Sequence, residues 1–280
     1  MVLFRMCLMA LLCLVAVRSQ TREEAEKRLG QLPPDQRAYE RFRFWLSLQA
    51  PEAQRGPDVL PRYSQYLKTQ GFTESDIAGQ LKFVEEGERR LEVERWNRIL
   101  TAEKPVFNTN PNAFLVAMVK GLKPGTALDV GMGQGRNAVW LAQQGWSVTG
   151  FDPAEKAVAL ANQNAAKSGV KLTTEIKGEE DFAFGESRWD LILISYAGGR
   201  GLADRVQRAL KPGGILLIEA FHRDATKERS IGAGVVFDTG ELPSLFSGLR
   251  VIRYEEPVET ADFGQQRVRL VRYCAAKPEP

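Results

Sequence analysis

The chain of 280 residues contains little cysteine and almost no histidine. Its cysteines are Cys7, Cys13 and Cys274, and its one histidine is His222. A disulfide framework or a Cys/His metal site requires more of these residues than the chain has, so we expect no bound metal. A single histidine also argues against a Ser-His-Asp triad.

Neither sign of charge is in large excess. The net charge is only +3, and apolar residues make up 44% of the chain. Large basic patches with interleaved aromatic residues, which bind structured nucleic acid, are missing. The length allows one large domain, or one domain with a helical extension, around a sizeable core. We therefore expect no nucleic-acid partner; the oligomeric state is left open, with a monomer favoured.

Long apolar runs are missing too, apart from one at the N-terminus, "MVLFRMCLMALLCLVAVRSQ". The run over residues 6–17 is too short to span a bilayer comfortably. Arg5 precedes the run, and Val17 and Ser19 suit the small positions before a cleavage site. This pattern predicts a signal peptide over residues 1–19 and export, to the periplasm or the medium. The alternatives are a start set too early in a cytoplasmic protein, or an apolar tail that is not cleaved.

Residues 20–103 are rich in charge and predict a helical N-terminal extension. Thr73 and Asp76 have the spacing of a capping box at the start of its longest helix. The apolar positions that follow at helical intervals are Ile77, Leu81, Val84 and Leu91. They give the helix one apolar stripe, which we expect to pack on the main domain at residues 104–280.

In the main domain, short apolar runs alternate with helical patterns. Strands are expected at 128–130 and 147–151 and in "VKLTTEI", "WDLILIS" and "ILLIEAF". Helices are expected at 136–144, at 153–168 with Asp152 as cap, and in "GLADRVQRAL"; Asn110 should cap an earlier helix, and "KPGG" should be a turn. The alternation predicts an α/β fold with a Rossmann-like, doubly wound, mostly parallel sheet. "LRVIRYEEPV" and "QRVRLVRYCA" predict a C-terminal antiparallel strand pair.

A glycine-rich loop joins the first strand to its helix in "DVGMGQGRNAVWLA". Its glycines are Gly131, Gly133 and Gly135, and in a parallel sheet such a loop lies where ligands bind. The dinucleotide pattern G-x-G-x-x-G would require glycine where Arg136 stands, and no Gly-Lys-Ser/Thr of a phosphate loop follows. These departures argue against a nicotinamide, flavin or nucleoside triphosphate ligand.

Four segments in order resemble the class I S-adenosylmethionine-dependent methyltransferases. They are "DVGMGQGRNAVWLA", "VTGFDP", "WDLILIS" and "ALKPGGILLIEAF", within roughly residues 105–275. The "GRNA" ending and the upstream "PNAFL" are similar to the branch of tellurite and thiopurine methyltransferases. The resemblance implies S-adenosyl-L-methionine as cofactor and methyl transfer as the activity.

The resemblance also implies how the cofactor is held. The glycine loop would lie against the methionyl part and the ribose, and the two oxygens of Asp152 would accept the ribose hydroxyls. Asp129 would orient the loop or the amino group, and Glu180 or Asp181 would lie near the adenine. The residues implied to bind the cofactor are Asp129, Gly131, Gly133, Gly135, Arg136, Asn137, Asp152, Glu180, Asp181 and Ser195.

Each of these residues also has a plainer interpretation. Asp152 could serve only as a helix cap, and Asp129 could only brace the loop. Glu180 and Asp181 could form a solvated acidic loop. Upstream, Trp96, Phe107 and Asn112 lie where related enzymes have a lid over the cofactor, although aromatic residues there are also common in cores.

Two residues are candidates for catalysis, His222 after the fifth strand and Tyr196 after the fourth. Both lie at the carboxyl edge of the predicted sheet, where an acceptor should approach, and either could act as a base or a polar contact. The plainer interpretation of His222 is an exposed loop residue.

The acceptor is expected to be a small molecule and a soft nucleophile, such as a thiol or a chalcogen oxyanion. The N/D-P-P-Y motif of amide-methylating enzymes is absent after "WDLILIS". Methyl transfer from a sulfonium depends mainly on positioning, which suits a domain without an obvious acid–base pair. The alternative is an exported interaction module that binds the cofactor but is catalytically inactive.

We predict that the signal peptide is removed near Ser19. N-terminal sequencing of the protein from its own host should find a new terminus close to Gln20. An intact Met1 on protein from the soluble cytoplasmic fraction would contradict this prediction.

Overall fold

The computed structural model describes residues 29–54, 56, 58–227 and 231–279. The predicted signal peptide and the first residues of the predicted helical extension lie outside these ranges. The chain divides into two compact units, residues 1–92 and 93–280. The division falls within helix α5 (Glu74–Leu100), whereas we predicted a boundary at residues 103 and 104.

The described part of the N-terminal unit is helical and has its own aromatic core. Its elements are α3 (Pro34–Ser47), the 3-10 helix η1 (Pro51–Gln54), α4 (Val59–Thr69) and the first part of α5. Phe42, Trp45 and Tyr63 pack together, with ring centroids 5.1 Å apart for Trp45 and Tyr63. Ile77 and Val84, from the apolar stripe that we expected to pack on the main domain, are buried in this core.

The predicted capping box at the start of α5 is confirmed. The backbone N–H of Asp76 donates to Thr73 Oγ1 at 3.2 Å, and the backbone N–H of Thr73 donates to the Asp76 carboxylate at 3.3 Å. Two N–H groups that the helix leaves without a partner are thereby satisfied.

The second unit is built around one mostly parallel sheet. Its strands are β1 (Thr126–Val130), β2 (Ser147–Asp152), β3 (Thr173–Ile176), β4 (Trp189–Ser195), β5 (Leu210–His222), β6 (Val236–Phe237), β7 (Arg250–Glu255), β8 (Val258–Thr260) and β9 (Arg267–Ala276). The order across the sheet is β3-β2-β1-β4-β5-β9-β7, with β6 beside β5 and β8 beside β9. The pairs of β9 with β5, β7 and β8 are antiparallel, which confirms the predicted C-terminal strand pair.

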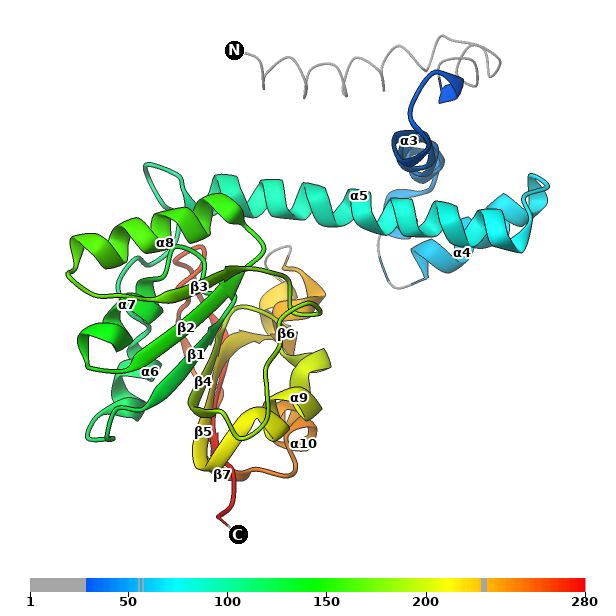
Figure 1. Cartoon of the computed structure of the whole chain (residues 1–280). Helices are drawn as coiled ribbons and strands as arrows, with labels where there is room; N and C mark the ends of the chain where they lie inside the picture. The colour runs from blue at the N-terminus through cyan, green and yellow to red at the C-terminus, as the bar shows by residue number, and fades with distance from the viewer. Residues whose placement is uncertain (1–28, 55, 57, 228–230, 280) are drawn as a thin grey trace. The chain divides into compact units, whose positions relative to one another are not determined.

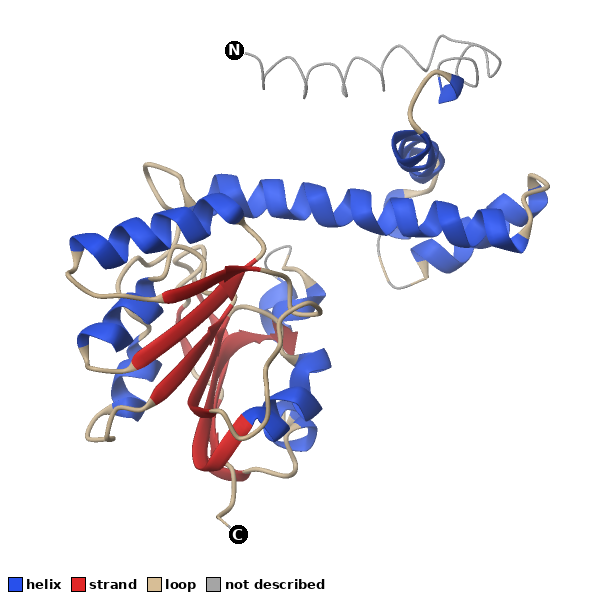
Figure 2. Cartoon of the chain, viewed as in Figure 1, coloured by secondary structure: helices blue, strands red, loops and turns tan. Residues whose placement is uncertain are grey.

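Helices cover both faces of this sheet (Figures 1 and 2). On one face lie α6 (Ala113–Val119), α7 (Arg136–Gln143) and α8 (Glu155–Lys167), and on the other α9 (Ala203–Ala209) and α10 (Glu241–Leu245). The residues of β4 show why both faces are buried: Leu191 and Leu193 belong to the core under α6 and α7, and Ile192 and Ile194 to the core under α9 and α10. The predicted fold class is therefore confirmed.

No helix joins β3 to β4 among the described residues. Phe182 and Phe184 of this connection fill the part of the core that a connecting helix would cover. Phe182 stacks on Phe151 of β2 with ring centroids 4.1 Å apart. The remaining short elements are the 3-10 helices η2 (Arg200–Leu202), η3 (Arg223–Lys227) and η4 (Ala233–Val235).

Three local predictions were wrong. Asn112, and not Asn110, caps α6, because its side chain accepts a hydrogen bond from the backbone N–H of Leu115 at 2.9 Å. Asp152 ends β2 instead of capping α8. In the first turn of α8, the backbone N–H of Lys156 donates to Asn97 Oδ1 of α5. "KPGG" belongs to β5, which already pairs with β4 at Leu210, so these residues form a bulge in the strand.

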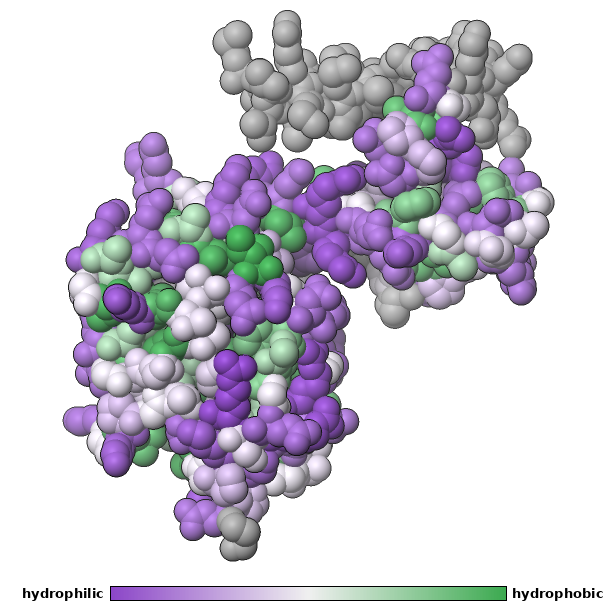
Figure 3. Space-filling view, in the orientation of Figure 1, coloured by the Kyte–Doolittle hydropathy of each residue, from purple (hydrophilic) through white to green (hydrophobic). Residues whose placement is uncertain are grey.

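Most of the surface visible in Figure 3 is hydrophilic, with a few apolar patches between charged side chains. No helix in the described ranges is both long and apolar enough to cross a membrane.

Candidate functional site

The order of the parallel strands reverses between β1 and β4, which are neighbours although β2 and β3 lie between them in the sequence. Loops that leave the carboxyl ends of these two strands run to opposite sides, and ligands bind in the crevice between them. The glycine loop leaves β1 at this point. The site is therefore positioned by the topology of the sheet.

The glycine loop has a backbone that only glycine adopts easily. Gly131, Gly133 and Gly135 have φ angles of 63°, 55° and 79°, in the left-handed region. A Cβ atom on Gly131 would lie 2.4 Å from Cβ of Ala197, and one on Gly135 would lie 2.8 Å from Cβ of Ala161. Conformation and crowding therefore both require glycine, and the backbone is left open to close approach by a ligand.

Asp152 holds the middle of this loop. Its Oδ2 accepts a hydrogen bond from the backbone N–H of Gly133 at 3.0 Å, and its Oδ1 accepts one from Ala154 at 2.8 Å. Burial raises the pKa of Asp152, and these two hydrogen bonds oppose the rise. Each oxygen keeps a second lone pair, so the carboxylate can brace the loop and still accept hydroxyl groups of a ligand.

Asp129 of β1 is a fully buried carboxyl group beneath the same loop. Burial raises its pKa to about 7, while the nearby charge of Arg136 and a hydrogen bond from the backbone of Ala138 lower it. Its Oδ2 has no hydrogen-bond partner. An unpartnered buried carboxyl oxygen is costly, so this position suits a ligand with a positive charge or a hydrogen-bond donor.

A small hollow adjoins the glycine loop, and apolar side chains form much of its wall. Leu100, Phe107 and Phe263 line it opposite the loop. A Cβ on Gly133 would lie 3.2 Å from Cδ2 of Leu100, and Phe263 stacks on Phe107 with centroids 5.1 Å apart. Trp96 does not line the hollow but packs edge-on against Phe263.

Arg136 and Asn137, the first residues of α7, also line the hollow. Among the described residues that line the hollow, Arg136 is the one charged residue. It forms an ion pair with Asp262 at 2.8 Å and donates to the backbone oxygen of Asn110 at 2.9 Å. Asn137 Oδ1 accepts a hydrogen bond from the backbone N–H of Asn112 at 2.9 Å, so it also positions the start of α6.

Arg136 is one end of a buried polar network that continues through Asp262 to Asn112 and Glu219. Asn112 donates to both Asp262 and Glu219, at 2.8 and 2.7 Å. Glu219 of β5 also accepts hydrogen bonds from Tyr196 and from Arg272, at 2.9 and 2.6 Å. Glu219 is a carboxylate inside the apolar run "ILLIEAF", and that signal in the sequence could have identified it.

Tyr196 lies in this network at the end of β4. It has a φ angle of 56°, which is strained for a residue other than glycine, and its hydroxyl group donates to Glu219. Burial and the charge of Glu219 raise its pKa well above the usual value. Ser195, one residue earlier, lines the hollow, and its Oγ accepts a hydrogen bond from Arg136 at 3.4 Å. Tyr196 as a catalytic residue stays a prediction.

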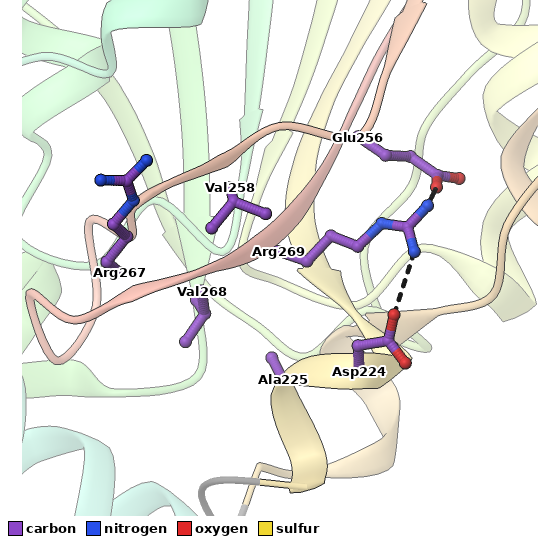
Figure 4. A pocket seen from close by; sticks show the side chains of 7 residues that line it. All are labelled: Asp224, Ala225, Glu256, Val258, Arg267, Val268 and Arg269. Carbon is purple, nitrogen blue, oxygen red and sulfur yellow. Dashed lines mark hydrogen bonds and ion pairs between the residues drawn. The ribbon is translucent and has the colours of Figure 1, made fainter.

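His222 belongs to a different polar cluster. Its Nε2 lies 3.0 Å from Thr239 Oγ1, and its Nδ1 accepts a hydrogen bond from the backbone N–H of Asp224 at 3.1 Å. The cluster borders a second hollow, where Arg269 lies between Asp224 and Glu256 (Figure 4). His222 is buried and not among the residues that line the hollow at the glycine loop, and its catalytic role stays a prediction.

Glu180 and Asp181 lie in the connection between β3 and β4, and both are exposed. Neither lines the hollow at the glycine loop. Their predicted contact with the adenine stays a prediction.

Comparison with known proteins finds similarity to methyltransferases. Residues 127–214, which contain the glycine loop and Asp152, match the family model described as "Methyltransferase domain". In architecture, the chain is similar to a solved S-adenosylmethionine-dependent methyltransferase from Methanosarcina mazei, with a TM-score of 0.51 and 18% identity over 61% of this chain and 100% of that one. At that identity the likeness concerns the fold alone.

Curated relatives agree. An uncharacterized methyltransferase of Synechocystis is 36% identical over 36% of this chain and 50% of its own length. The probable S-adenosyl-L-methionine-dependent methyltransferase TehB of Haemophilus influenzae is 24% identical over 51% of this chain and 52% of its own length. The chain thus spans about half the length of these relatives. Residues 127–214 thus match a methyltransferase domain, and the chain is similar to S-adenosylmethionine-dependent methyltransferases that include TehB.

The residues at the glycine loop fit the cofactor of this family. S-adenosylmethionine carries a sulfonium cation, an ammonium group and a ribose with two hydroxyl groups. The unpartnered oxygen of Asp129 and the free lone pairs of Asp152 match such groups in charge and in hydrogen bonding. The open backbone at Gly131 to Gly135 allows close contact.

We predict that S-adenosylmethionine binds more tightly as the pH rises through 7. The raised pKa of Asp129, about 7, leaves this group largely protonated at lower pH, and a cationic ligand favours the ionised form. Affinity should fall by up to about tenfold for each pH unit below 7. Calorimetric titration on either side of pH 7 measures this.

Asp129→Asn is the control, because the ligand's own ammonium group also titrates. The variant should lose most of the pH dependence while it keeps an acceptor for the N–H of Ala138. An equally steep dependence in the variant would contradict the role of Asp129.

Proposed function

We propose that this protein transfers the methyl group of S-adenosylmethionine to a small molecule that is a soft nucleophile, a thiol or a chalcogen oxyanion. The observation that carries the proposal is the glycine loop, which Asp152 holds, with the unpartnered oxygen of the buried Asp129 close by in the sequence and an apolar wall facing the loop. This arrangement serves to hold and enclose two reactants, and the described residues that line the hollow include no histidine, tyrosine, lysine or carboxylate.

The protein's own residues would divide the work of cofactor binding. Asp152 would accept the ribose hydroxyls, and Asp129 would carry the negative charge that balances the cofactor's positive charges. The backbone of the glycine loop would lie along the ligand. When bound, the cofactor supplies a methyl group on a sulfonium leaving group that is already activated.

Water exclusion would come from the wall of Leu100, Phe107 and Phe263. Phe107 is almost fully buried, and Phe263 joins it from the turn between β8 and β9. A dry site strengthens electrostatic contacts and prevents loss of the methyl group to water.

The lining of the hollow supports a soft nucleophile. Its one charged residue is Arg136, which cannot act as a base near neutral pH. The Tyr196 hydroxyl is bound to Glu219, and His222 lies in another cluster. A thiolate or a chalcogen oxyanion is already nucleophilic near neutral pH and needs positioning more than proton removal. An arginine at the hollow also favours an anion.

A second candidate function is methylation of a small oxygen acceptor with His222 as base. A ubiquinone biosynthesis O-methyltransferase of Paramagnetospirillum magneticum is 30% identical over 42% of this chain and 49% of its own length, which favours it. This candidate requires an acceptor that reaches from the glycine loop to His222.

Nothing in the comparisons favours the inactive interaction module. Export remains part of the proposal and depends on residues 1–19, outside the described ranges.

We predict that Asp152→Asn weakens binding of S-adenosylmethionine by about 1–3 kcal/mol, the usual effect of losing a charge-assisted hydrogen bond. Calorimetric titration of the purified variant measures this. Asp238→Asn is a matched control, because Asp238 is exposed, paired with Arg223 and distant from the glycine loop in the sequence. Unchanged affinity in both Asp152→Asn and Asp152→Ala would refute the assignment.

We predict that a panel of acceptors separates the two candidate functions. Thiols, selenite or tellurite should be methylated, and His222→Ala should leave the pH–rate profile unchanged, because positioning carries the reaction. Turnover of a phenol or a carboxylate that depends on His222 would favour the second candidate. Cofactor binding without turnover of any acceptor would favour the inactive module.

A further inference from the structure

Arg136 lines the hollow at the glycine loop and pairs with the carboxylate of Asp262. Its side chain is only 7% exposed, and that of Asp262 is 12% exposed. The guanidinium group lies at the start of α7, directly after the glycine loop, and among the described residues it supplies the only charge on the wall of the hollow. A carboxylate in this hollow has no other cationic side chain to bind.

Asp262 also fastens the turn between β8 and β9 to the segment that precedes α6. Its Oδ1 accepts a hydrogen bond from Asn108 at 2.9 Å, and its Oδ2 accepts one from Asn112 at 2.8 Å. The backbone N–H of Asn108 donates to the backbone oxygen of Asp262 at 2.7 Å. The carboxylate that pairs with Arg136 therefore helps to hold the turn, together with this backbone hydrogen bond.

The same turn carries part of the wall. Phe263 follows Asp262 directly and stacks on Phe107 across an isolated bridge between the two residues. Gly264 and Gln265 then have φ angles of 77° and 46°. A shift of Asp262 away from Arg136 would therefore move Phe263 relative to the glycine loop.

We propose that Asp262 is an internal substitute for the methionyl carboxylate of the cofactor. S-adenosylmethionine would bind by exchanging its own carboxylate for that of Asp262 on Arg136, and the exchange would release the turn that carries Phe263. This inference rests on the cofactor part of the proposed function and not on the identity of the acceptor. Arg136 then recognises the amino-acid end of the ligand, and Asp262 sets how tightly that end is held.

Two ligands test the exchange without any methyl transfer. S-adenosylhomocysteine has the carboxylate, whereas 5′-methylthioadenosine has the same nucleoside and a thioether but no amino-acid group. In Asp262→Asn and Asp262→Ala, the affinity for S-adenosylhomocysteine should rise about three- to tenfold relative to that for 5′-methylthioadenosine, because the internal competitor is gone. Arg136→Gln should abolish the preference for the ligand with the carboxylate.

Two Asp262 variants are needed because this side chain also binds Asn108 and Asn112. Asp262→Asn keeps one acceptor oxygen, and Asp262→Ala keeps none, so a common shift in the affinity ratio reports the lost charge. Asp224→Asn is the matched control: it removes a carboxylate that pairs with Arg269 of β9, outside the hollow at the glycine loop, and it should leave the ratio unchanged.

The outcomes are distinguishable. If neither ligand binds the unmodified protein, the proposed function fails. If both ligands bind and the Asp262 variants weaken them equally, or leave their ratio unchanged, the exchange is refuted and Asp262 only supports the turn. A rise in the ratio in Asp262 variants, together with its loss in Arg136→Gln, supports the exchange.

Discussion

The hydrogen bond between the Asp152 carboxylate and the backbone N–H of Gly133 joins two neighbouring strands at their carboxyl ends. It fixes the middle of the glycine loop in a conformation with left-handed glycines at alternate positions. The start of α7 depends on this loop, and with it the position of Arg136. The Arg136–Asp262 pair, together with backbone hydrogen bonds to Asn108 and Val106, then holds the turn between β8 and β9. The site is thus a series of contacts that begins with one buried carboxylate.

Two buried carboxyl groups beneath one loop have opposite surroundings. Asp152 accepts two backbone hydrogen bonds, whereas Asp129 keeps an oxygen without a partner. Asp152 therefore braces the loop with both of its oxygens, whereas one oxygen of Asp129 is buried without a partner among the described residues. A protein tolerates such an unsatisfied group where binding later compensates for it. This difference is why we expect Asp129, and not Asp152, to make ligand binding depend on pH.

The sequence predicted the sheet and the position of the loop because both follow from local patterns. The apolar run before Gly131, and the strand that ends at Asp152, each have a period and a boundary that a short window reveals. Helix starts were predicted less well. Asn110 and Asn112 are both good caps, and only the contact between Asn112 and Asn137 decides between them. The cap of α8 comes from Asn97, far away in the sequence, and no local pattern encodes it.

The wall of the site was the part least accessible from sequence. Asp262 and Phe263 lie more than a hundred residues from the glycine loop, in a turn without a recognisable motif. Their role appears only when β9 pairs with β5 and brings the turn over the loop. Glu219 differs, because a lone carboxylate within a buried strand is already unusual in the sequence. His222 shows the reverse case, since its position after β5 was predicted but its partners lie in a separate cluster.

The strand β7 forms one free edge of the sheet, and this has a consequence for how the protein behaves in concentrated solution. An unpaired strand offers its backbone to other chains, and the exposed Val251 and Ile252 would make such pairing favourable. Arg250 and Arg253 flank these two residues, and the register shifts between Val251 and Arg253 where β7 pairs with β9. Repulsion between arginines of different molecules and the irregular strand both oppose aggregation through this edge. Because salt screens the repulsion, association of molecules through this edge should increase as ionic strength rises.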